Sequence, residues 1–282
     1  MKGQIDRDRL TKDAYEIRKK ILTCIMGAGG GHVGGSMSVA DCLAALYGGI
    51  ANITPENVQS PDRDKIILSK GHSGAALYAA LAHHGFFPEE MLSTMNANGT
   101  LLPGHPDRSK LAGVEISTGS LGQGGSMAAG IAYADRLDNR SSKTYLILGD
   151  GELNEGQTWE ALMFIAHHNL KNLVVIVDNN GIQCDGRLED ICRPFDLAEK
   201  FRAFGYDVID VVRGNDVLAV YDALVCAQNP ADSPVCVLLH TKKGAKLSCF
   251  EDRVSSHHCK LTPEQYRLCL DDIARDYSQM EV

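Results

Sequence analysis

The sequence predicts an α/β fold in which a doubly wound parallel sheet carries helices on both of its faces. Three features indicate it: short apolar runs rich in β-branched residues, helical stretches that alternate with those runs, and glycine-rich polar turns that follow them. Continuous apolar runs suit strands that are covered on both faces. Alternation of strands with helices is typical of a parallel sheet.

The elements follow one another without interruption by a repeat, a low-complexity tract or a Pro/Ser-rich linker, which predicts one domain over residues 1–282. The expected strands are 64–69 (DKIILS), 144–148 (TYLIL), 173–177 (LVVIV), 206–212 (YDVIDVV) and 235–239 (VCVLL). The clearest helical stretches are 13–27, 38–49, 73–85, 125–137, 158–168, 216–228 and 262–276.

Composition excludes several classes of protein. The chain of 282 residues carries a net charge of −8 and no basic stripe, which argues against a nucleic-acid partner. Its first twenty residues are charged throughout, and no apolar run approaches the roughly 20 residues that span a bilayer, so we expect neither a signal peptide nor membrane insertion. Nine cysteines without a CxxC pair predict reduced, mostly buried thiols in a cytoplasmic protein.

An acidic glycine turn follows the second expected strand, in ILGDGELNEGQTWEAL at residues 147–162. Glycines on both sides of Asp150 allow a bulky ligand to approach the backbone, and the helix expected near Glu155 offers its N-terminus to an anion. Because Asp150 would repel a bare phosphate, we expect a cation between the two.

A second set of oxygen ligands follows the next strand, in Asp178-Asn179-Asn180-Gly181-Ile182. Carboxylate, carboxamide and backbone oxygens suit Mg²⁺ or Ca²⁺. Taken singly, Asp150 is better explained as a helix cap and residues 178–181 as a turn. Their position on consecutive strand ends favours a metal–diphosphate site.

The stretch GDG-ELNEG-QTWEA…NLVVIVDNN resembles the thiamine-diphosphate signature, and EGQTWEA with AHHNLKNLVVIVDNNGIQCDG resembles its transketolase branch. The resemblance implies thiamine diphosphate and Mg²⁺ as cofactors, with Ca²⁺ or Mn²⁺ as alternative ions. It implies that Asp150, Asn180 and the carbonyl of Ile182 hold the metal. Gly151 and Asn180 would then contact the diphosphate, and Glu155 would be a structural acid near the cofactor.

Four histidines lie in loops rich in small residues: His32 in GAGGGHVGGS, His72 in SKGHSG, His105 in LLPGHPD and His257 in EDRVSSHHCK. Each alone is equally explained as a cap or turn histidine. Together they resemble the histidines of the transketolase channel, which implies His72 and His257 beside the diphosphate. It further implies His32 and His105 at the sugar hydroxyls, with His32, His105 and His257 as catalytic groups because neutral imidazoles exchange protons near pH 7.

The loop STGSLGQG resembles the family's TTGPLGQG loop, which implies that Gly119 and Leu121 offer backbone groups to the aminopyrimidine ring. Two departures stand out. GHVGG replaces GHPG, and His257-His258-Cys259 replaces Trp-His-Gly, so that the choice of His257 over His258 rests on its spacing after Glu251-Asp252.

The resemblance runs from about residue 12 to about 266, the first third to half of a full-length transketolase. In that family the catalytic Glu comes from a pyrimidine-binding domain, which no stretch here resembles. The resemblance therefore implies the diphosphate-binding subunit of a split transketolase. Such a polypeptide would move a two-carbon ketol unit between sugar phosphates and be inactive without a separate pyrimidine-binding subunit, with the two expected to pair as α2β2.

Three other functions stay open on the sequence alone. They are the α subunit of a thiamine-dependent 2-oxoacid dehydrogenase, a specialised transketolase of secondary metabolism, and a non-catalytic cofactor-binding module.

Overall fold

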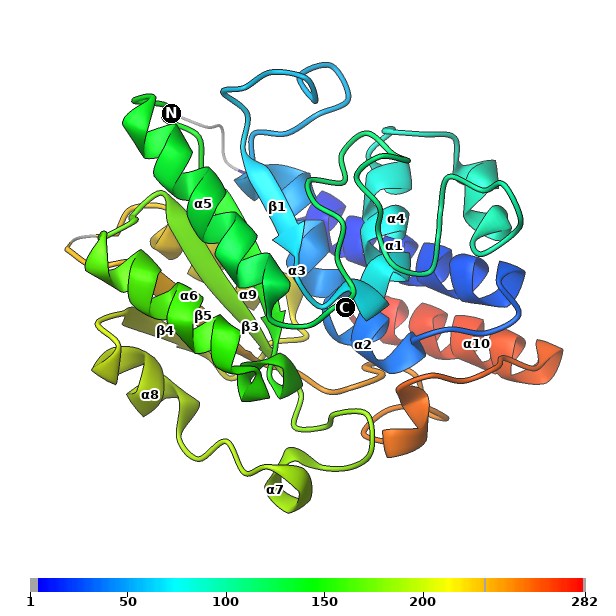
Figure 1. Ribbon diagram of the computed structural model, residues 1–282. Helices are drawn as coiled ribbons and strands as arrows, with labels where there is room; N and C mark the ends of the chain where they lie inside the picture. Colours follow the sequence, from blue (N-terminus) through cyan, green and yellow to red (C-terminus); the bar gives the residue numbers. More distant parts are fainter. Residues whose placement is uncertain (1–4, 231, 281–282) are drawn as a thin grey trace.

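The computed structural model describes residues 5–230 and 232–280, and its centre is a five-stranded parallel sheet with the order β1-β2-β3-β5-β4 (Figure 1). All five predicted strands are confirmed, with ends that shift by no more than a residue or two. The strands are β1 (Lys65–Leu68), β2 (Thr144–Gly149), β3 (Leu173–Asn179), β4 (Asp207–Val211) and β5 (Val235–His240).

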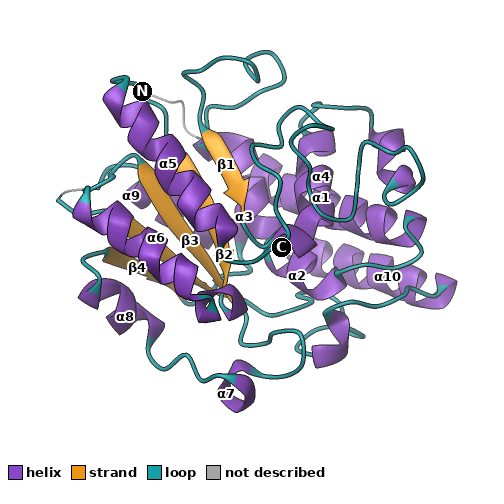
Figure 2. Ribbon diagram, in the orientation of Figure 1, coloured by secondary structure: helices purple, strands orange, loops and turns teal. Residues whose placement is uncertain are grey.

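Helices cover both faces of the sheet, as predicted (Figure 2). Alternate strand residues point to opposite sides, so that Ile66 and Leu68 pack with one helical layer and Ile67 with the other. On the first side lie α1 (Arg7–Gly27), α2 (Val33–Ser38), α3 (Ala40–Ala45), α4 (Gly74–His83), α9 (Val217–Ala227) and α10 (Pro263–Met280). On the second lie α5 (Gln123–Leu137), α6 (Gly156–His167) and α8 (Leu197–Ala203).

Three predicted helices have wrong boundaries, and the last of them ends at Met280 instead of residue 276. The first begins at Arg7, ahead of residue 13, because the Asp6 carboxylate accepts a hydrogen bond from the Arg9 N–H and caps the helix there. The helix expected over 38–49 is broken at Val39, since Ser38 ends α2 and its hydroxyl donates to the buried Asp178.

Several short elements were not predicted, because they span too few residues to show a helical period. They are α2, α7 (Leu188–Ile191), α8, and the 3₁₀ turns Gly71–Ser73, Glu89–Thr94, Gly151–Asn154 and Val254–Ser256. The end of the stretch predicted as helix over 38–49 is a π turn, Leu46–Ile50.

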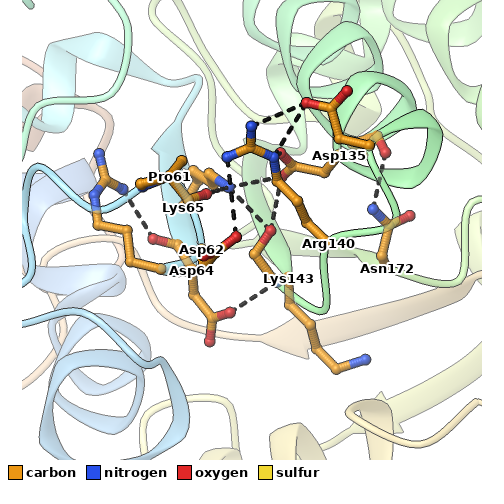
Figure 3. A network of polar contacts seen from close by, with 12 residues as sticks. Pro61, Asp62, Asp64, Lys65, Asp135, Arg140, Lys143 and Asn172 are labelled. Atoms are coloured by element: carbon orange, nitrogen blue, oxygen red, sulfur yellow. Dashed lines mark hydrogen bonds and ion pairs between the residues drawn. The ribbon is translucent and has the colours of Figure 1, made fainter.

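A network of buried charges ties the amino ends of β1 and β2 to the end of α5 (Figure 3). The Lys65 ammonium donates to Asp135 Oδ2 at 2.7 Å and to Ser142 Oγ at 3.0 Å. The Asp64 carboxylate accepts from the Lys143 N–H at 2.7 Å. Each of these buried groups has a hydrogen-bonding partner, which offsets the cost of taking its charge out of water.

The cysteine prediction was only partly right. All nine thiols are free, but only Cys24, Cys42, Cys236 and Cys269 are buried, while Cys184, Cys192 and Cys226 are exposed. Cys184 and Cys192 belong to the loop after β3, which lines a cavity and is not part of the core. Among the described residues, no helix is long and apolar enough to cross a membrane.

Candidate active site

A cavity of about 570 Å³ lies beyond the carboxyl ends of the central strands, where ligands bind in sheets of this kind. Lys70 follows β1, Asp150 follows β2, Asn180 follows β3 and Lys243 follows β5. Every site residue predicted from the sequence lines this cavity: His32, His72, His105, Gly119, Leu121, Asp150, Gly151, Glu155, Asn180, Ile182 and His257.

Loops distant in the sequence are joined by backbone hydrogen bonds at the cavity. Gly31 and Cys259 form an isolated antiparallel bridge, with N–H···O distances of 2.9 and 3.0 Å. The Gly244 N–H donates to the Gly34 carbonyl at 2.9 Å. These bonds set the histidine loop at the start of the chain against both loops that follow β5.

The four predicted histidines form one cluster of rings. The His32 centroid lies 5.3 Å from that of His72, 5.8 Å from His105 and 5.2 Å from His257. Burial lowers the pKa of His32 to about 3 and of His257 to about 4, with neighbouring cationic or imidazole groups adding to the effect. Burial also lowers the pKa of His72 well below its ordinary value. These three imidazoles are therefore neutral at pH 7 and serve as hydrogen-bonding groups.

His257 is the member of the His257-His258 pair that lines the cavity. Its Nδ1 lies 3.0 Å from the Lys243 ammonium, which is a donor only. Nδ1 is therefore the acceptor, and the ring proton of the neutral His257 resides on Nε2. His258 is exposed and packs its ring on His32 with centroids 4.8 Å apart.

The aminopyrimidine loop expected from the sequence packs on the turn that carries His72. A Cβ added at Gly71 would lie 2.6 Å from the Gly119 nitrogen, so only glycine permits this approach. The Thr118 N–H donates to the Pro106 carbonyl at 3.1 Å, which places the His105 loop beside the same segment. Glu155 is exposed at the edge of the cavity, where it precedes α6.

Asp150 is a buried carboxylate that lacks a cationic partner. Its Oδ1 accepts from the Gly151 N–H at 2.8 Å and its Oδ2 from the Gly181 N–H at 2.5 Å. Burial, with the neighbouring Asp178 charge, raises the pKa of Asp150 to about 7. No lysine or arginine within residues 5–230 and 232–280 forms an ion pair with it.

Asp178 is engaged elsewhere and is not free for a metal. Its carboxylate pairs with the Lys70 ammonium and accepts from Ser38 and Thr241. Burial opposes its ionisation, but the Lys70 charge and these donors outweigh burial and keep the pKa of Asp178 below its ordinary value. Asn180 Nδ2 also donates to Asp178 at 3.1 Å. The amide oxygen of Asn180 accepts from the Ile182 N–H at 3.2 Å and keeps a second lone pair for a cation.

Lys243 is a buried ammonium without an anionic partner among the described residues, the opposite case to Asp150. Only 2% of its surface is exposed, and its ammonium donates to the Ile182 carbonyl at 2.9 Å and the Gln183 carbonyl at 3.3 Å. No carboxylate in the described part of the chain pairs with it. Burial and the nearby Lys70 charge lower the pKa of Lys243 to about 8.

The site thus holds a buried carboxylate without a cation and a buried ammonium without an anion. A buried charge is costly until it is paired. A divalent ion at Asp150, Asn180 and the second lone pair of the Ile182 carbonyl, together with a diphosphate at Lys243, would satisfy both charges. The residues present therefore fit a Mg²⁺–diphosphate group.

Three buried residues of this site were missed from the sequence: Lys70, Glu152 and Lys243. Lysine and glutamate are surface residues by default, so their type gave no reason to single them out. Position was the available signal, since Lys70 precedes the Gly71-His72 turn, Glu152 follows the acidic glycine turn, and Lys243 follows the last strand.

A second cluster of possible metal ligands lies apart from the cavity, at Asp13, His83 and His84. Both ring nitrogens of His83 already have partners, Asp13 Oδ1 at 2.8 Å and the Lys20 ammonium at 3.3 Å. The Arg9 guanidinium lies 3.7 Å from Asp13 Oδ2. Two neighbouring cations disfavour a metal ion, and we assign none here.

Fold and site together define an α/β protein whose cavity fits a metal–diphosphate group. Residues 11–274 match the family described as "Transketolase, thiamine diphosphate binding domain". The chain belongs to the transketolase family.

Two relatives of similar length are named as subunits. One, from Clostridium sp. (strain MSTE9), is 42% identical over 97% of this chain and 98% of its own length, and is named 6-deoxy-6-sulfo-D-fructose transketolase subunit SqwG. Another, from Actinobacillus succinogenes, is named as one subunit of the apulose-4-phosphate transketolase and is 38% identical over 94% of this chain and 96% of its own length.

Full-length transketolases are matched over less than half of their chains. The human enzyme is 33% identical over 96% of this chain but only 42% of its own. The crystal structure of a Pichia stipitis transketolase mutant in complex with fructose 6-phosphate superposes with a TM-score of 0.86, at 26% identity, over 96% of this chain and 43% of that one.

Proposed function

We propose that this chain is the diphosphate-binding subunit of a two-component transketolase that uses Mg²⁺ and thiamine diphosphate. The observation that carries the proposal is the unpaired Asp150 and Lys243 beside a cluster of neutral imidazoles, because this combination suits a metal–diphosphate and a polyhydroxylated substrate at one site. The reaction is transfer of a two-carbon ketol unit from a ketose to an aldose.

Each group of residues has a defined task in this proposal. Asp150, Asn180 and the Ile182 carbonyl hold Mg²⁺, while Lys243 and Gly151 contact the diphosphate, and Gly119 and Leu121 offer backbone groups to the aminopyrimidine. When bound, the cofactor supplies the electron sink for breaking the carbon–carbon bond. The protein contributes position, charge and proton transfer.

The histidines act on the sugar. His32 and His105 bind its hydroxyls. Because burial lowers the pKa of His32 to about 3, His32 serves as a hydrogen-bond acceptor, and His105 is the histidine that takes the hydroxyl proton and returns it. His257, held by Lys243 with its proton on Nε2, is a donor beside the diphosphate. His72 completes the cofactor side of the cluster.

A separate pyrimidine-binding chain supplies the rest of each site in this proposal, including the catalytic glutamate. Two relatives that match this chain end to end are named as subunits, whereas full-length transketolases are more than twice as long, which supports a split enzyme. We infer an α2β2 assembly in the cytoplasm, in which this chain forms one diphosphate-binding domain.

The substrates are sugars that carry a terminal anion. The two subunit relatives are named for 6-deoxy-6-sulfofructose and for apulose 4-phosphate, and so cover a sulfonate and a phosphate. A panel that contains these two ketoses with xylulose 5-phosphate and fructose 6-phosphate would identify the donor.

Ketol transfer is expected only when this chain is combined with a pyrimidine-binding chain encoded beside it. The test assays each chain alone and the co-expressed pair, with thiamine diphosphate, Mg²⁺ and ribose 5-phosphate as acceptor, and determines the mass of the pair by light scattering. Full activity of this chain as a monomer would disprove the two-component proposal. Bound cofactor without transfer from any sugar would disprove the activity.

Replacing His105 with alanine is expected to lower kcat/KM for the donor ketose roughly ten- to hundredfold, the effect of losing a hydrogen bond to a substrate hydroxyl. Affinity for thiamine diphosphate should stay unchanged. The control is His168→Ala, at the end of α6 and outside the cavity. Equal kinetics for His105→Ala and the wild-type pair would remove His105 from the sugar site.

A further inference from the structure

We infer that Glu152 is a positioning residue that holds three cofactor-binding segments in register, an inference that rests on the proposed function. Glu152 follows the acidic glycine turn that carries Asp150, and the residue is 1% exposed. Its role had no counterpart in the sequence motifs, where it is merely one of several acids after the acidic glycine turn.

One carboxylate receives hydrogen bonds from three different segments. Oε1 accepts from the Ser69 hydroxyl and from the Gly122 N–H at 2.9 Å, and Oε2 accepts from the Gly149 N–H at 3.2 Å. The Thr158 hydroxyl donates to the Glu152 carbonyl at 3.2 Å and attaches the residue to α6.

Each of these segments continues directly into residues that line the cavity. Ser69 precedes Lys70 at the end of β1, and Gly149 precedes Asp150 at the end of β2. Gly122 follows Leu121 and starts α5 with a left-handed conformation, φ = 84°. Glu152 therefore sets the acidic glycine turn that carries Asp150 at a defined distance from the loop that offers Gly119 and Leu121.

That distance matters because the aminopyrimidine and the diphosphate are the two ends of one molecule, thiamine diphosphate, whose length is limited by its covalent bonds. A shift between the two binding segments weakens contact at one end or the other, and losses from small misplacements are large. Glu152 lines the cavity, but its carboxylate oxygens are engaged by these three donors, so it acts through the segments that they belong to.

Only a carboxylate satisfies all three donors. Glutamate accepts with both oxygens, whereas glutamine presents an NH₂ group at one of the two positions. In one orientation that NH₂ faces the Gly149 N–H, and in the other it faces the Gly122 N–H. Either way, one buried donor loses its acceptor, although the size of the side chain is unchanged.

The test compares Glu152→Gln with Glu115→Gln in the assembled enzyme. Glu115 is also a largely buried glutamate, but it pairs with Arg63 away from the cavity. We expect Glu152→Gln to raise the Kd and KM for thiamine diphosphate about tenfold, with kcat at saturating cofactor within about threefold of wild type. Glu115→Gln should alter thermal stability alone.

Ser69→Ala removes one of the three donors to the Glu152 carboxylate and is expected to raise the KM for thiamine diphosphate about threefold. If Glu152→Gln does not fold, the Ser69→Ala variant provides the test. An unchanged cofactor affinity in these variants, or an equal loss in Glu115→Gln, would overturn the inference. Because binding is measured separately from transfer, a wild-type pair that binds cofactor but transfers no ketol would refute the proposed reaction and still test Glu152. A wild-type pair that binds no thiamine diphosphate would refute both.

Discussion

Replacing Lys243 with methionine is expected to weaken thiamine diphosphate binding about a hundredfold while leaving the unliganded protein as stable as before, or more so. The two effects have one cause. Loss of a buried charge that pairs with the diphosphate costs several kcal/mol of binding free energy. Each loss of about 1.4 kcal/mol raises the Kd tenfold. In the unliganded protein the same charge has no carboxylate partner among the described residues, so its removal relieves a desolvation cost. This gain offsets the loss of its hydrogen bonds to Ile182, Gln183 and His257.

The measurement is calorimetric titration of the assembled enzyme with thiamine diphosphate at saturating Mg²⁺, together with thermal unfolding of the unliganded protein. Lys242→Met is the matched control, because the neighbouring Lys242 is exposed and pairs with Glu251 at 2.8 Å. An equal loss of affinity in the two variants would mean that general charge, and not the buried ammonium, attracts the diphosphate.

Asp150→Asn is expected to lower ketol transfer by at least about a thousandfold, because the charge stabilisation that a metal supplies amounts to several kcal/mol. The carboxamide keeps the size of the side chain but lacks the negative charge that attracts a divalent ion. Added Mg²⁺ should saturate the wild-type pair and fail to rescue the variant.

Activity and cofactor binding would be followed across a Mg²⁺ titration, with Asp272→Asn as the control. Asp272 is likewise a buried aspartate and accepts from the Ser248 N–H at 2.8 Å, but it lies outside the cavity. Recovery of Asp150→Asn at high Mg²⁺ would show that Asp150 contributes only weakly to the metal site.

The predicted metal residues and histidine loops meet at one cavity because of a rule visible in the sequence. Parallel strands present their carboxyl ends at the same edge of the sheet, so the turns after residues 148 and 177 had to be neighbours. The small residues beside His32, His72 and His105 likewise marked loops that a ligand approaches closely.

Other features depended on contacts that no local pattern reveals. The choice between His257 and His258 depends on the bridge from Cys259 to Gly31, residues more than two hundred positions apart. The break at Val39 follows Ser38, whose hydroxyl donates to Asp178 on a distant strand.

By itself the sequence determined the parallel α/β fold, the family and the cavity-lining motifs, since strand periodicity and short glycine-rich motifs are local properties. Only the tertiary structure decided that Lys70, Glu152 and Lys243 belong to the site. Lysine and glutamate have the same local pattern on a surface as in a buried site, and their roles follow from which distant charges and backbone donors the fold places beside them.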